Sequence, residues 1–422
     1  MTFKKKIVTC MASAMAMAVL LAGCGNSNNE QTAISEPQVT EAAEDKAEET
    51  AAPTTETAAP TTETAAEDEI QNKDASTMSL KEAYKDLFDI GVAVNSWQLA
   101  DKKVLARITK DYSTFTCENE MKPDYLLDHN ASMEAKDGMP VLTTEKLEEI
   151  LTMAEDAGLK MRGHTLVWHS QTPEWLFREG YDDGKDYVDK DTMLKRMESY
   201  IKKVITYCQE KHPGVVYAWD VVNECASDNK GLRTDSLWYK VIGEEYIEKA
   251  FEYARKYADK DVKLFINDYG MTSPERRKTY TALVKKIWDQ GNIDGIGMQS
   301  HHDRENFDVA QIETSIYAFS AIADGIEIQL TELDMHYNDN SEAAMKEQAE
   351  NYKKLFDLLV NVDTKGHANI TNVTFWGLDD EHTWLTGFKK ETSYPLLYDK
   401  DGNAKPSYFA IIEAAEAAKA AQ

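Results

Sequence analysis

The stretch from Val215 to Glu224 reads VVYAWDVVNE and ends abruptly on an amide and a carboxylate. Its valines and aromatic residues favour a β-strand, and a Pro-Gly pair ends the element before it. Because the run is apolar on both faces, we expect a parallel strand that is covered on both sides. Strand alternation places Asp220 and Val222 on the same face as Glu224. A single glutamate after an apolar run is usually a solvated loop residue or a helix cap, so its meaning depends on a second such run.

A second run of this kind extends from Gly325 to Asp334, reads GIEIQLTELD and carries Glu332 near its end. Alternation predicts that Ile328, Leu330, Glu332 and Asp334 share one face. Hydrolysis of a glycosidic bond needs one protonated carboxyl group, which donates to the leaving oxygen, and one ionised carboxylate, which attacks or stabilises the sugar. The glutamates at the ends of the two runs are therefore a candidate catalytic pair.

Residues 79–422 alternate short strand-like runs with longer amphipathic segments, which is typical of repeated βα units. Eight such units predict an α/β fold, the (β/α)8 barrel. A doubly wound sheet is the structural alternative, but no glycine-rich phosphate loop follows the first strand. The predicted strands are Ile90–Asn95, Ser113–Asn119, Leu159–Trp168, Val215–Glu224, Val262–Tyr269, Ile293–His302, Gly325–Asp334 and Ile370–Asp380. The predicted helices are Ser96–Lys110, Thr144–Ala157, Thr192–Lys211, Trp238–Ala258, Pro274–Asp289, Val309–Ala323, Ser341–Leu359 and Ser407–Lys419.

Polar residues gather at the carboxyl ends of the predicted strands. Barrel enzymes place their chemistry at this end, whereas a surface without a site would carry such residues at both ends. The convergence therefore predicts a catalytic mouth. Strand by strand, the polar and aromatic residues at these ends are Asn95, Glu118 with Asn119, His164 to His169, Asn223 with Glu224, Asn267 with Asp268, Gln299 to His302, Glu332 with Asp334, and Trp376 with Asp380.

Seven motifs follow one another along the chain: FTCENEMK (115–122), GHTLVWHSQTPEW (163–175), WDVVNE (219–224), NDYG (267–270), GMQSHH (297–302), TELD (331–334) and WGLDDEHTW (376–384). In this order they resemble glycoside hydrolase family 10, the endo-1,4-β-xylanases, over essentially all of residues 80–419. The resemblance implies a (β/α)8 barrel and a retaining mechanism, with Glu224 as acid/base and Glu332 as nucleophile.

The resemblance also implies roles for the other residues at the strand ends. Glu118, Asn119 and Lys122 would bind the sugar one ring further from the bond, His164 and Asn223 would bind hydroxyls of the attacked ring, and Gln299 would lie beside it. His301 would bridge Glu332 and Asp334, and a hydrogen-bonded chain of this kind keeps a nucleophile ionised. Trp168, Trp376 and Trp384 would wall the cleft and leave little room for the hydroxymethyl group that glucose has and xylose lacks.

The histidines show no HExxH-type spacing, so we expect neither a metal nor another cofactor. We read Cys117, Cys208 and Cys225 as small core residues rather than as a disulfide framework.

The first 78 residues predict that the protein is exported and attached to the cell membrane by a lipid. Residues 1–23 combine lysines with an apolar run that is too short for a membrane span, so they predict a signal peptide. The LAGC that ends at Cys24 resembles the bacterial lipobox, which implies a lipidated cysteine and a lipoprotein anchored on the outer face of the cell membrane. Residues 24–78 repeat an acidic Thr/Ala/Pro/Glu pattern without aromatic residues and predict a disordered linker.

The net charge of −27 argues against nucleic acid or an anionic membrane surface as a partner, whereas a neutral polymer is not repelled. The resemblance implies xylan and xylo-oligosaccharides as substrates, and we expect a monomer. Two alternatives stay open at this point. One is another retaining barrel endo-glycosidase, a β-glucanase or mannanase, and the other is a non-catalytic sugar-binding lipoprotein, which would have no use for paired glutamates at strand ends.

Overall fold

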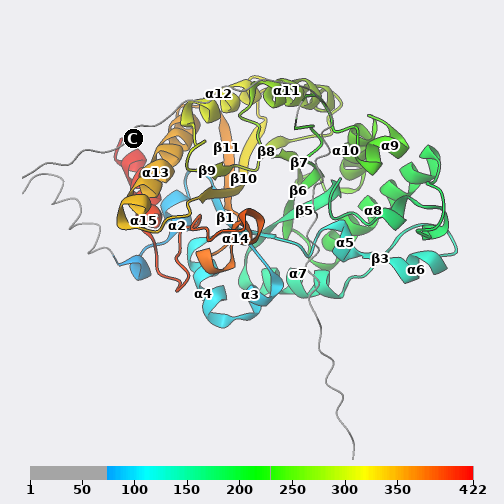
Figure 1. Ribbon diagram of the computed structural model, residues 1–422, viewed down its shortest axis with the longest axis horizontal. Helices are drawn as coiled ribbons and strands as arrows, with labels where there is room; N and C mark the ends of the chain where they lie inside the picture. Colours follow the sequence, from blue (N-terminus) through cyan, green and yellow to red (C-terminus); the bar gives the residue numbers. More distant parts are fainter. Residues whose placement is uncertain (1–73, 229, 422) are drawn as a thin grey trace, which may run out of the picture. The chain divides into compact units, whose positions relative to one another are not determined.

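Parallel strands form a closed barrel with helices around it in the computed structural model, which describes residues 74–228 and 230–421 (Figure 1). The order of the sheet is β11-β1-β2-β5-β6-β7-β8-β10, and β10 also pairs with β11, which closes the ring. The predicted (β/α)8 fold is therefore confirmed. The barrel strands are β1 (Asp89–Val94), β2 (Thr114–Cys117), β5 (Lys160–Trp168), β6 (Val216–Asn223), β7 (Lys263–Asp268), β8 (Gly295–Met298), β10 (Glu327–His336) and β11 (Asn369–Phe375).

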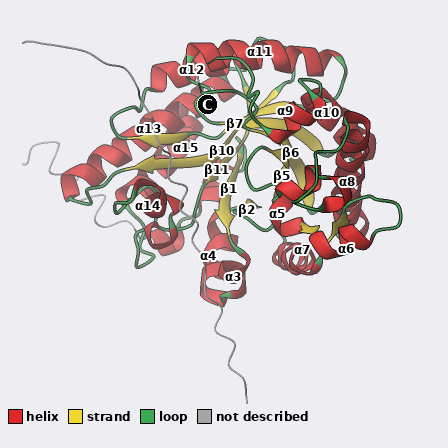
Figure 2. Ribbon diagram, turned by 45° about the vertical axis from the view of Figure 1, so that its right-hand side comes forward, coloured by secondary structure: helices red, strands yellow, loops and turns green. Residues whose placement is uncertain are grey.

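Long helices surround the strands, as the red and yellow ribbons of Figure 2 show. They begin and end where the sequence supplies caps: Ser273 accepts from the backbone N–H of Arg276 at the start of α11, and Gly158 adopts a left-handed φ of 66° after α7. The longer helices are α4 (Lys102–Asp111), α7 (Glu145–Ala157), α8 (Lys190–Lys211), α10 (Tyr246–Tyr257), α11 (Pro274–Asp289), α12 (Val309–Ser320), α13 (Glu342–Thr364) and α15 (Pro406–Ala421).

Short elements fill the connections, most of them at the mouth of the barrel. The three-residue strand β9 (His301–Asp303) continues beyond β8 and pairs with β10. The others are α2 (Leu80–Tyr84), α3 (Ser96–Ala100), α5 (Pro123–Leu126), β3 (Leu127–Asp128), α6 (His129–Glu134), β4 (Val141–Leu142), α9 (Leu237–Ile242), α14 (Trp384–Lys389) and the 3-10 turns Ala75–Thr77, Glu174–Phe177, Glu179–Tyr181 and Asp380–His382.

Two predicted helices are each broken in two. The segment predicted as Ser96–Lys110 divides into α3 and α4 at Asp101, whose carboxylate caps α4 by accepting from the next turn. The segment predicted as Trp238–Ala258 divides into α9 and α10 at Gly243, which has a φ of 96°. An L side chain rarely adopts that conformation, so the break requires glycine.

The interior of the barrel holds a buried ion pair instead of a purely apolar core. Arg162 donates to both oxygens of Asp220 at 3.0 and 2.6 Å, and its Nε donates to Gln329 at 2.7 Å. Between the strands and the helices the packing is apolar, and the rings of Phe356 and Phe375 stack at 6.0 Å. A buried charge is tolerated only when it is paired, and here Asp220 pairs the charge of Arg162 while Gln329 accepts its remaining hydrogen bond.

The amino-terminal predictions fall almost entirely outside the described residues. The signal peptide (1–23), Cys24 and most of the 24–78 linker belong to that part of the chain. Asp74 to Met78 are described, although the linker was predicted to reach Met78: Lys110 donates to the carbonyl of Ala75, and Tyr408 donates to that of Met78. Within residues 74–228 and 230–421, no helix combines the length and the apolar character needed to cross a membrane.

Candidate active site

The carboxyl ends of the strands surround a cleft with a volume of about 690 Å³. It brings together every site residue predicted from the sequence except Asp334, which lies one hydrogen bond behind His301, and Cys24, which is outside the described residues. Its lining residues are Glu118, Asn119, Lys122, His164, Trp168, Gln171, Asn223, Glu224, Tyr269, Gly270, Gln299, His301, Glu332, Trp376, Trp384 and Phe388.

Glu224 follows β6 in a left-handed backbone conformation, with a φ of 54°. The simple alternation predicted for this strand is wrong. The ladder to β7 shifts between Asp220 and Val222, so Asp220 and Asn223 both reach polar partners inside the barrel. The backbone N–H of Glu224 donates to the carbonyl of Asn267 at 2.9 Å. An irregular ladder and a strained residue thus aim the carboxylate into the cleft.

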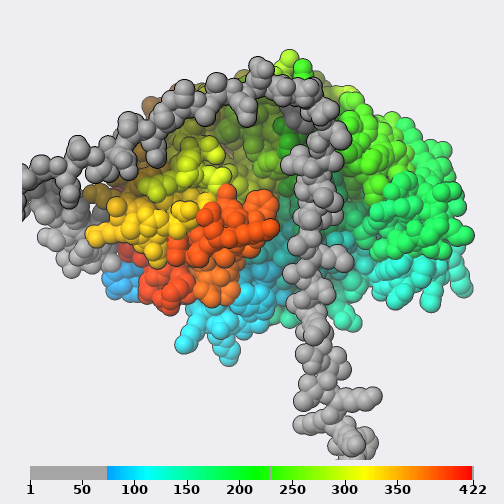
Figure 3. All heavy atoms as spheres, viewed as in Figure 1, coloured from blue at the N-terminus to red at the C-terminus, as the bar shows by residue number. Residues whose placement is uncertain are grey.

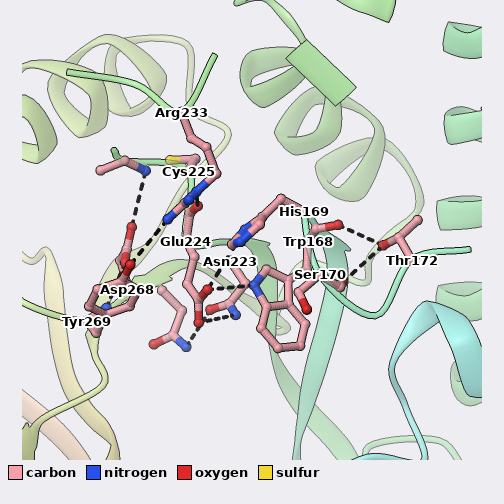
Figure 4. Close-up of polar contacts among 12 residues, drawn as sticks. Trp168, His169, Ser170, Thr172, Asn223, Glu224, Cys225, Arg233, Asp268 and Tyr269 are labelled. Atoms are coloured by element: carbon pink, nitrogen blue, oxygen red, sulfur yellow. Dashed lines mark hydrogen bonds and ion pairs between the residues drawn. The ribbon is translucent and has the colours of Figure 1, made fainter. Parts of the chain in front are cut away.

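Both oxygens of the Glu224 carboxylate accept hydrogen bonds, and Nδ2 of the neighbouring Asn223 donates to Oε1 at 3.4 Å. The indole Nε1 of Trp168 donates to Oε2 at 2.8 Å, and Figure 4 shows the two groups pointing toward each other. The amide of Gln299 donates to Oε1 at 3.1 Å. Behind it, Nε of Arg233 donates to the backbone carbonyl of Glu224 at 3.2 Å, and Nη2 of the same guanidinium donates to the hydroxyl of Tyr269 at 3.2 Å. The neutral donors fix the direction of the Glu224 carboxylate without placing a full charge beside it.

Glu332 lies on β10, where the predicted alternation also fails. The ladder to β11 is irregular between Leu330 and Leu333. Gln329, rather than Leu330, faces the barrel interior and accepts from Arg162. Glu332 therefore does not share a face with Leu330, and the irregularity turns its carboxylate toward the cleft.

The surroundings of Glu332 favour its ionised form. Asn267 donates to Oε1 at 2.7 Å, and His301 lies 3.1 Å from Oε2 and 2.9 Å from Asp334. Burial raises the pKa of Glu332, but the hydrogen bond from His301 and the nearby imidazoles lower it by more, so its pKa falls below the usual value. Burial lowers the pKa of His301, but the charges of Asp334 and Glu332 raise it to about 10. At neutral pH the imidazolium therefore donates to both carboxylates.

The side chain of Asn267 packs against the backbone of Gly297, where no larger residue would fit. A Cβ on Gly297 would lie 2.5 Å from Oδ1 of Asn267, closer than any real Cβ contact. Glycine at this strand position therefore leaves space for the amide that orients Glu332.

The ion pair in the barrel forms the floor of the cleft. His164 donates from Nδ1 to Oδ2 of Asp220 at 2.9 Å, and the ring of His164 packs edge-on against Trp376 at 5.2 Å. Burial raises the pKa of Asp220, but Arg162 and His164 lower it by more, so this carboxyl group stays ionised. His164 is thereby fixed in orientation, and its Nε2 is left for a ligand in the cleft.

A second polar cluster follows β2. Glu118 accepts from the amide of Asn95 at 3.0 Å, and burial raises its pKa to about 7. Nζ of Lys122 lies 3.3 Å from the amide oxygen of Asn119 and 5.0 Å from the centre of the Trp168 ring. Burial lowers the pKa of Lys122, which the surrounding carboxylates oppose. These short, convergent donors and acceptors suit a ligand that carries several hydroxyl groups.

Two tryptophans after β11 cover the cleft. Trp376 is buried, whereas Trp384 is 36% exposed and donates from Nε1 to Oδ2 of Asp334 at 3.0 Å. The ring of Trp384 also packs against His301 at 5.1 Å. The indole therefore lies directly over the group that ionises Glu332.

Several residues at the site were not singled out from the sequence. Asn267 was recognised as a strand-end residue, and its closeness to Glu332 could have been expected from the barrel order. Tyr269 and Gln171 lie within recognised motifs, without a pattern that predicts contact with the cleft. Phe388 lies beyond the last motif, in a short helix that no periodicity predicts.

The three described cysteines and Trp175 pack against the core of the protein and do not line the cleft. Cys117, Cys208 and Cys225 are buried and form no disulfide, as predicted. In the part of the chain that the structure describes, no three His, Cys, Asp or Glu side chains are grouped so that they could hold a metal ion. Trp175 stacks on His129 at 4.5 Å and so belongs to the packing of a loop.

A family model described as glycosyl hydrolase family 10 matches residues 79–414. Endo-1,4-beta-xylanase B of Butyrivibrio fibrisolvens is 42% identical over 342 residues, which cover 80% of this chain and 53% of that protein. A putative endo-1,4-beta-xylanase of Caldicellulosiruptor saccharolyticus is 41% identical over 306 residues, covering 70% of this chain and 96% of that protein. The chain thus spans about half of the Butyrivibrio relative.

Solved structures show the same likeness. The intracellular xylanase TsXylA of Thermoanaerobacterium saccharolyticum, solved as a mutant in complex with xylotriose, superposes with a TM-score of 0.70 at 38% identity and covers 79% of this chain and 97% of that chain. The CBM22-1 and GH10 modules of the Clostridium thermocellum endo-1,4-beta-D-xylanase 10B, complexed with xylohexaose, superpose with a TM-score of 0.72 at 31% identity, covering 81% of this chain and 69% of that chain.

Proposed function

Because the chain belongs to glycosyl hydrolase family 10, we propose that it is a retaining endo-1,4-β-xylanase that cleaves internal linkages of xylan. One observation carries the proposal. A single cleft holds two glutamates: the charge of His301 favours the ionised form of Glu332, and neutral N–H donors of Trp168 and Gln299 orient Glu224. Double displacement requires two carboxyl groups in one cleft, one as an ionised nucleophile and the other as acid/base.

In the first step, Glu332 attacks the anomeric carbon while Glu224 donates its proton to the leaving oxygen. The protonated His301 keeps Glu332 ionised, and Asn267 holds the other oxygen of that carboxylate, which fixes the direction of attack. The products of this step are a covalent glycosyl-enzyme and a shortened chain with a free hydroxyl group.

In the second step, Glu224, now ionised, removes a proton from water, and the water attacks the anomeric carbon and releases Glu332. The negative charge of Glu332 disappears when the covalent bond forms and returns when it breaks. Two inversions restore the β configuration.

The walls of the cleft favour binding of xylose over binding of glucose. Trp384 covers His301, and Trp376 packs against His164, so bulky rings occupy the space beside the attacked sugar. A hydroxymethyl group has to fit against these rings, whereas xylose carries a hydrogen there. His164 and Asn223 bind the hydroxyls of this ring, and Glu118, Asn119 and Lys122 bind the next ring.

The sequence before the barrel completes the proposal. The lipobox-like LAGC supports lipidation of Cys24 after removal of a signal peptide, and the acidic repeats support a linker between this cysteine and the barrel. The enzyme would then act as a monomer on the outer face of a bacterial cell membrane, where xylo-oligosaccharides are released next to the cell that secretes it.

Substitution of each glutamate tests the assignment of roles. Glu224→Ala and Glu332→Ala should each abolish most hydrolysis of xylan. With a dinitrophenyl β-xylobioside, whose leaving group needs no protonation, the Glu224 variant should still form the glycosyl-enzyme and the Glu332 variant should not. Glu381→Ala, at an exposed glutamate outside the cleft lining, is the control. Equal losses in both variants with both substrates would contradict the assignment.

A further inference from the structure

The helix α14 presents a bare aromatic ring to the cleft. Phe388 is 68% exposed, more than any other large hydrophobic residue described as exposed, yet it lines the same cleft as the two glutamates. Its ring centre lies 4.9 Å from that of Trp384, with 42° between the planes. The two rings thus form a continuous aromatic surface that begins over His301 and extends outward.

Contacts on both sides of Phe388 hold α14 in place. At its start, Trp384 donates to Asp334 at 3.0 Å. At its end, Lys389 forms an ion pair with Asp303, the last residue of β9. The chain that follows is tied to His336, which lies 2.6 Å from the hydroxyl of Ser393. An exposed ring on an anchored helix loses little conformational entropy when a ligand packs on it.

The order of the strands shows on which side of the cleft Phe388 lies. In the closed ring of eight strands, β8 is opposite β2. Glu118 and Lys122 follow β2, whereas Asp303 ends β9, which continues from β8. In Figures 1 and 2, α14 and α5, the helix that begins after Lys122, lie on opposite sides of the strand ends. Figure 3 shows the orange-red segment that contains α14 standing forward on this face.

We propose that Phe388 is a sugar-binding residue on the leaving-group side of the cleft, where a pyranose ring of a β-1,4-linked chain stacks on it. The inference rests on the proposed function, which assigns Glu118 and Lys122 to the side of the attacked sugar and so leaves the opposite side to the leaving group. Tyr269, at the end of β7, lines this side as well. A xylopyranose ring offers two faces without a hydroxymethyl group, and such apolar C–H faces pack well on an aromatic ring.

Binding on the leaving-group side affects only substrates that have sugar rings there. An aryl β-xylobioside places a small phenol on that side, whereas xylohexaose places one or more xylose rings there. Phe388→Ala should therefore lower kcat/KM for xylohexaose roughly fivefold, chiefly through a higher KM, and leave kcat/KM for 4-nitrophenyl β-xylobioside unchanged. With xylohexaose labelled at its reducing end, the variant should also shift the preferred cleavage position toward that end, so that fewer rings occupy the leaving-group side.

Two further variants serve as controls. Phe388→Trp keeps an aromatic surface and should retain most of the activity on xylohexaose. Tyr317→Ala removes a 39% exposed ring on α12, outside the cleft lining, and should behave like the wild type with both substrates.

The outcomes separate this inference from the proposed function. An unchanged kcat/KM of Phe388→Ala on xylohexaose, in a wild-type enzyme that cleaves it, would overturn the role of Phe388 alone. Equal losses on xylohexaose and on the aryl xylobioside would also overturn it, because they would show that the substitution disturbs Trp384 and the catalytic groups. A wild-type protein that cleaves neither substrate would overturn the proposed function and this inference with it.

Discussion

His301→Asn removes the charge that holds Glu332 ionised. Asparagine is smaller, carries no charge and cannot donate to Glu332 and Asp334 together. A hydrogen bond to a charged group contributes about 1.5 to 3 kcal/mol, and each 1.36 kcal/mol of barrier is a factor of ten in rate. Loss of the bond to Glu332 should therefore lower kcat/KM by about 10- to 150-fold at the pH optimum.

The same substitution should move the acid limb of the pH profile. In the proposed mechanism Glu332 attacks only when it is ionised, and the hydrogen bond with His301 lowers its pKa against the opposing effect of burial. Without His301, burial dominates and the pKa of Glu332 rises. The acid limb of kcat/KM should therefore shift to higher pH, measured with 4-nitrophenyl β-xylobioside between about pH 3 and 8.

The neighbouring histidine provides a matched control. Burial lowers the pKa of His302 to about 4, and its ring packs on Phe307 at 5.4 Å, away from the cleft lining. His302→Asn should leave the acid limb where it is in the wild type. If His301→Asn also left the acid limb unmoved, or moved it to lower pH, the reasoning about the charge on Glu332 would be refuted.

Three further perturbations test other parts of the site. Trp168→Phe keeps a ring but loses the donor to Glu224, so kcat on xylan should fall roughly tenfold and kcat on a dinitrophenyl xylobioside much less. KM for xylotetraose should fall as the pH rises through about 7, where Glu118 ionises and accepts stronger hydrogen bonds, and this dependence should vanish in Glu118→Gln. Arg162→Met leaves Asp220 buried without its cation and should lower the free energy of unfolding in urea at pH 7 by about 3 to 5 kcal/mol. The pKa of Asp220 is lower in the folded protein than in the unfolded chain. In the wild type, the stabilisation by the Arg162–Asp220 ion pair is therefore complete above the unfolded pKa of about 3.9, and it should be lost as the pH falls through the lower pKa of the folded protein.

The sequence predicted the strands well because each is a short apolar run with turn residues around it. The α11 helix was predicted with its observed bounds, since Ser273 caps it and Pro274 occupies its first position. The break at Gly243 was missed because a helical pattern continues across it, and only the packing of α9 and α10 shows that the chain turns there.

The predicted alternation of side chains along β6 and β10 was wrong close to the two glutamates. The ladder shifts between Asp220 and Val222 and between Leu330 and Leu333 depend on the neighbouring strands, so no count along a single strand predicts them. These shifts occur within a few residues of the two glutamates. Residue identities and strand ends could therefore be predicted from the sequence, but the direction of each side chain could not.

The helix α14 marks the other limit of sequence reasoning. Its six residues are too few for a periodic pattern, and its position depends on contacts with Asp334 and Asp303 from other strands. No pattern in the sequence therefore singles out Phe388 as a residue of the cleft.

The anomeric configuration of the first products tests the central claim most directly. Xylan is digested with the wild-type enzyme, and proton NMR follows the newly formed reducing ends before mutarotation, with glucomannan and carboxymethylcellulose as parallel substrates. The account predicts short β-anomeric xylo-oligosaccharides from xylan and no products from the other two polymers. Products that appear first as α anomers would contradict the nucleophilic role of Glu332, and with it the two-step mechanism.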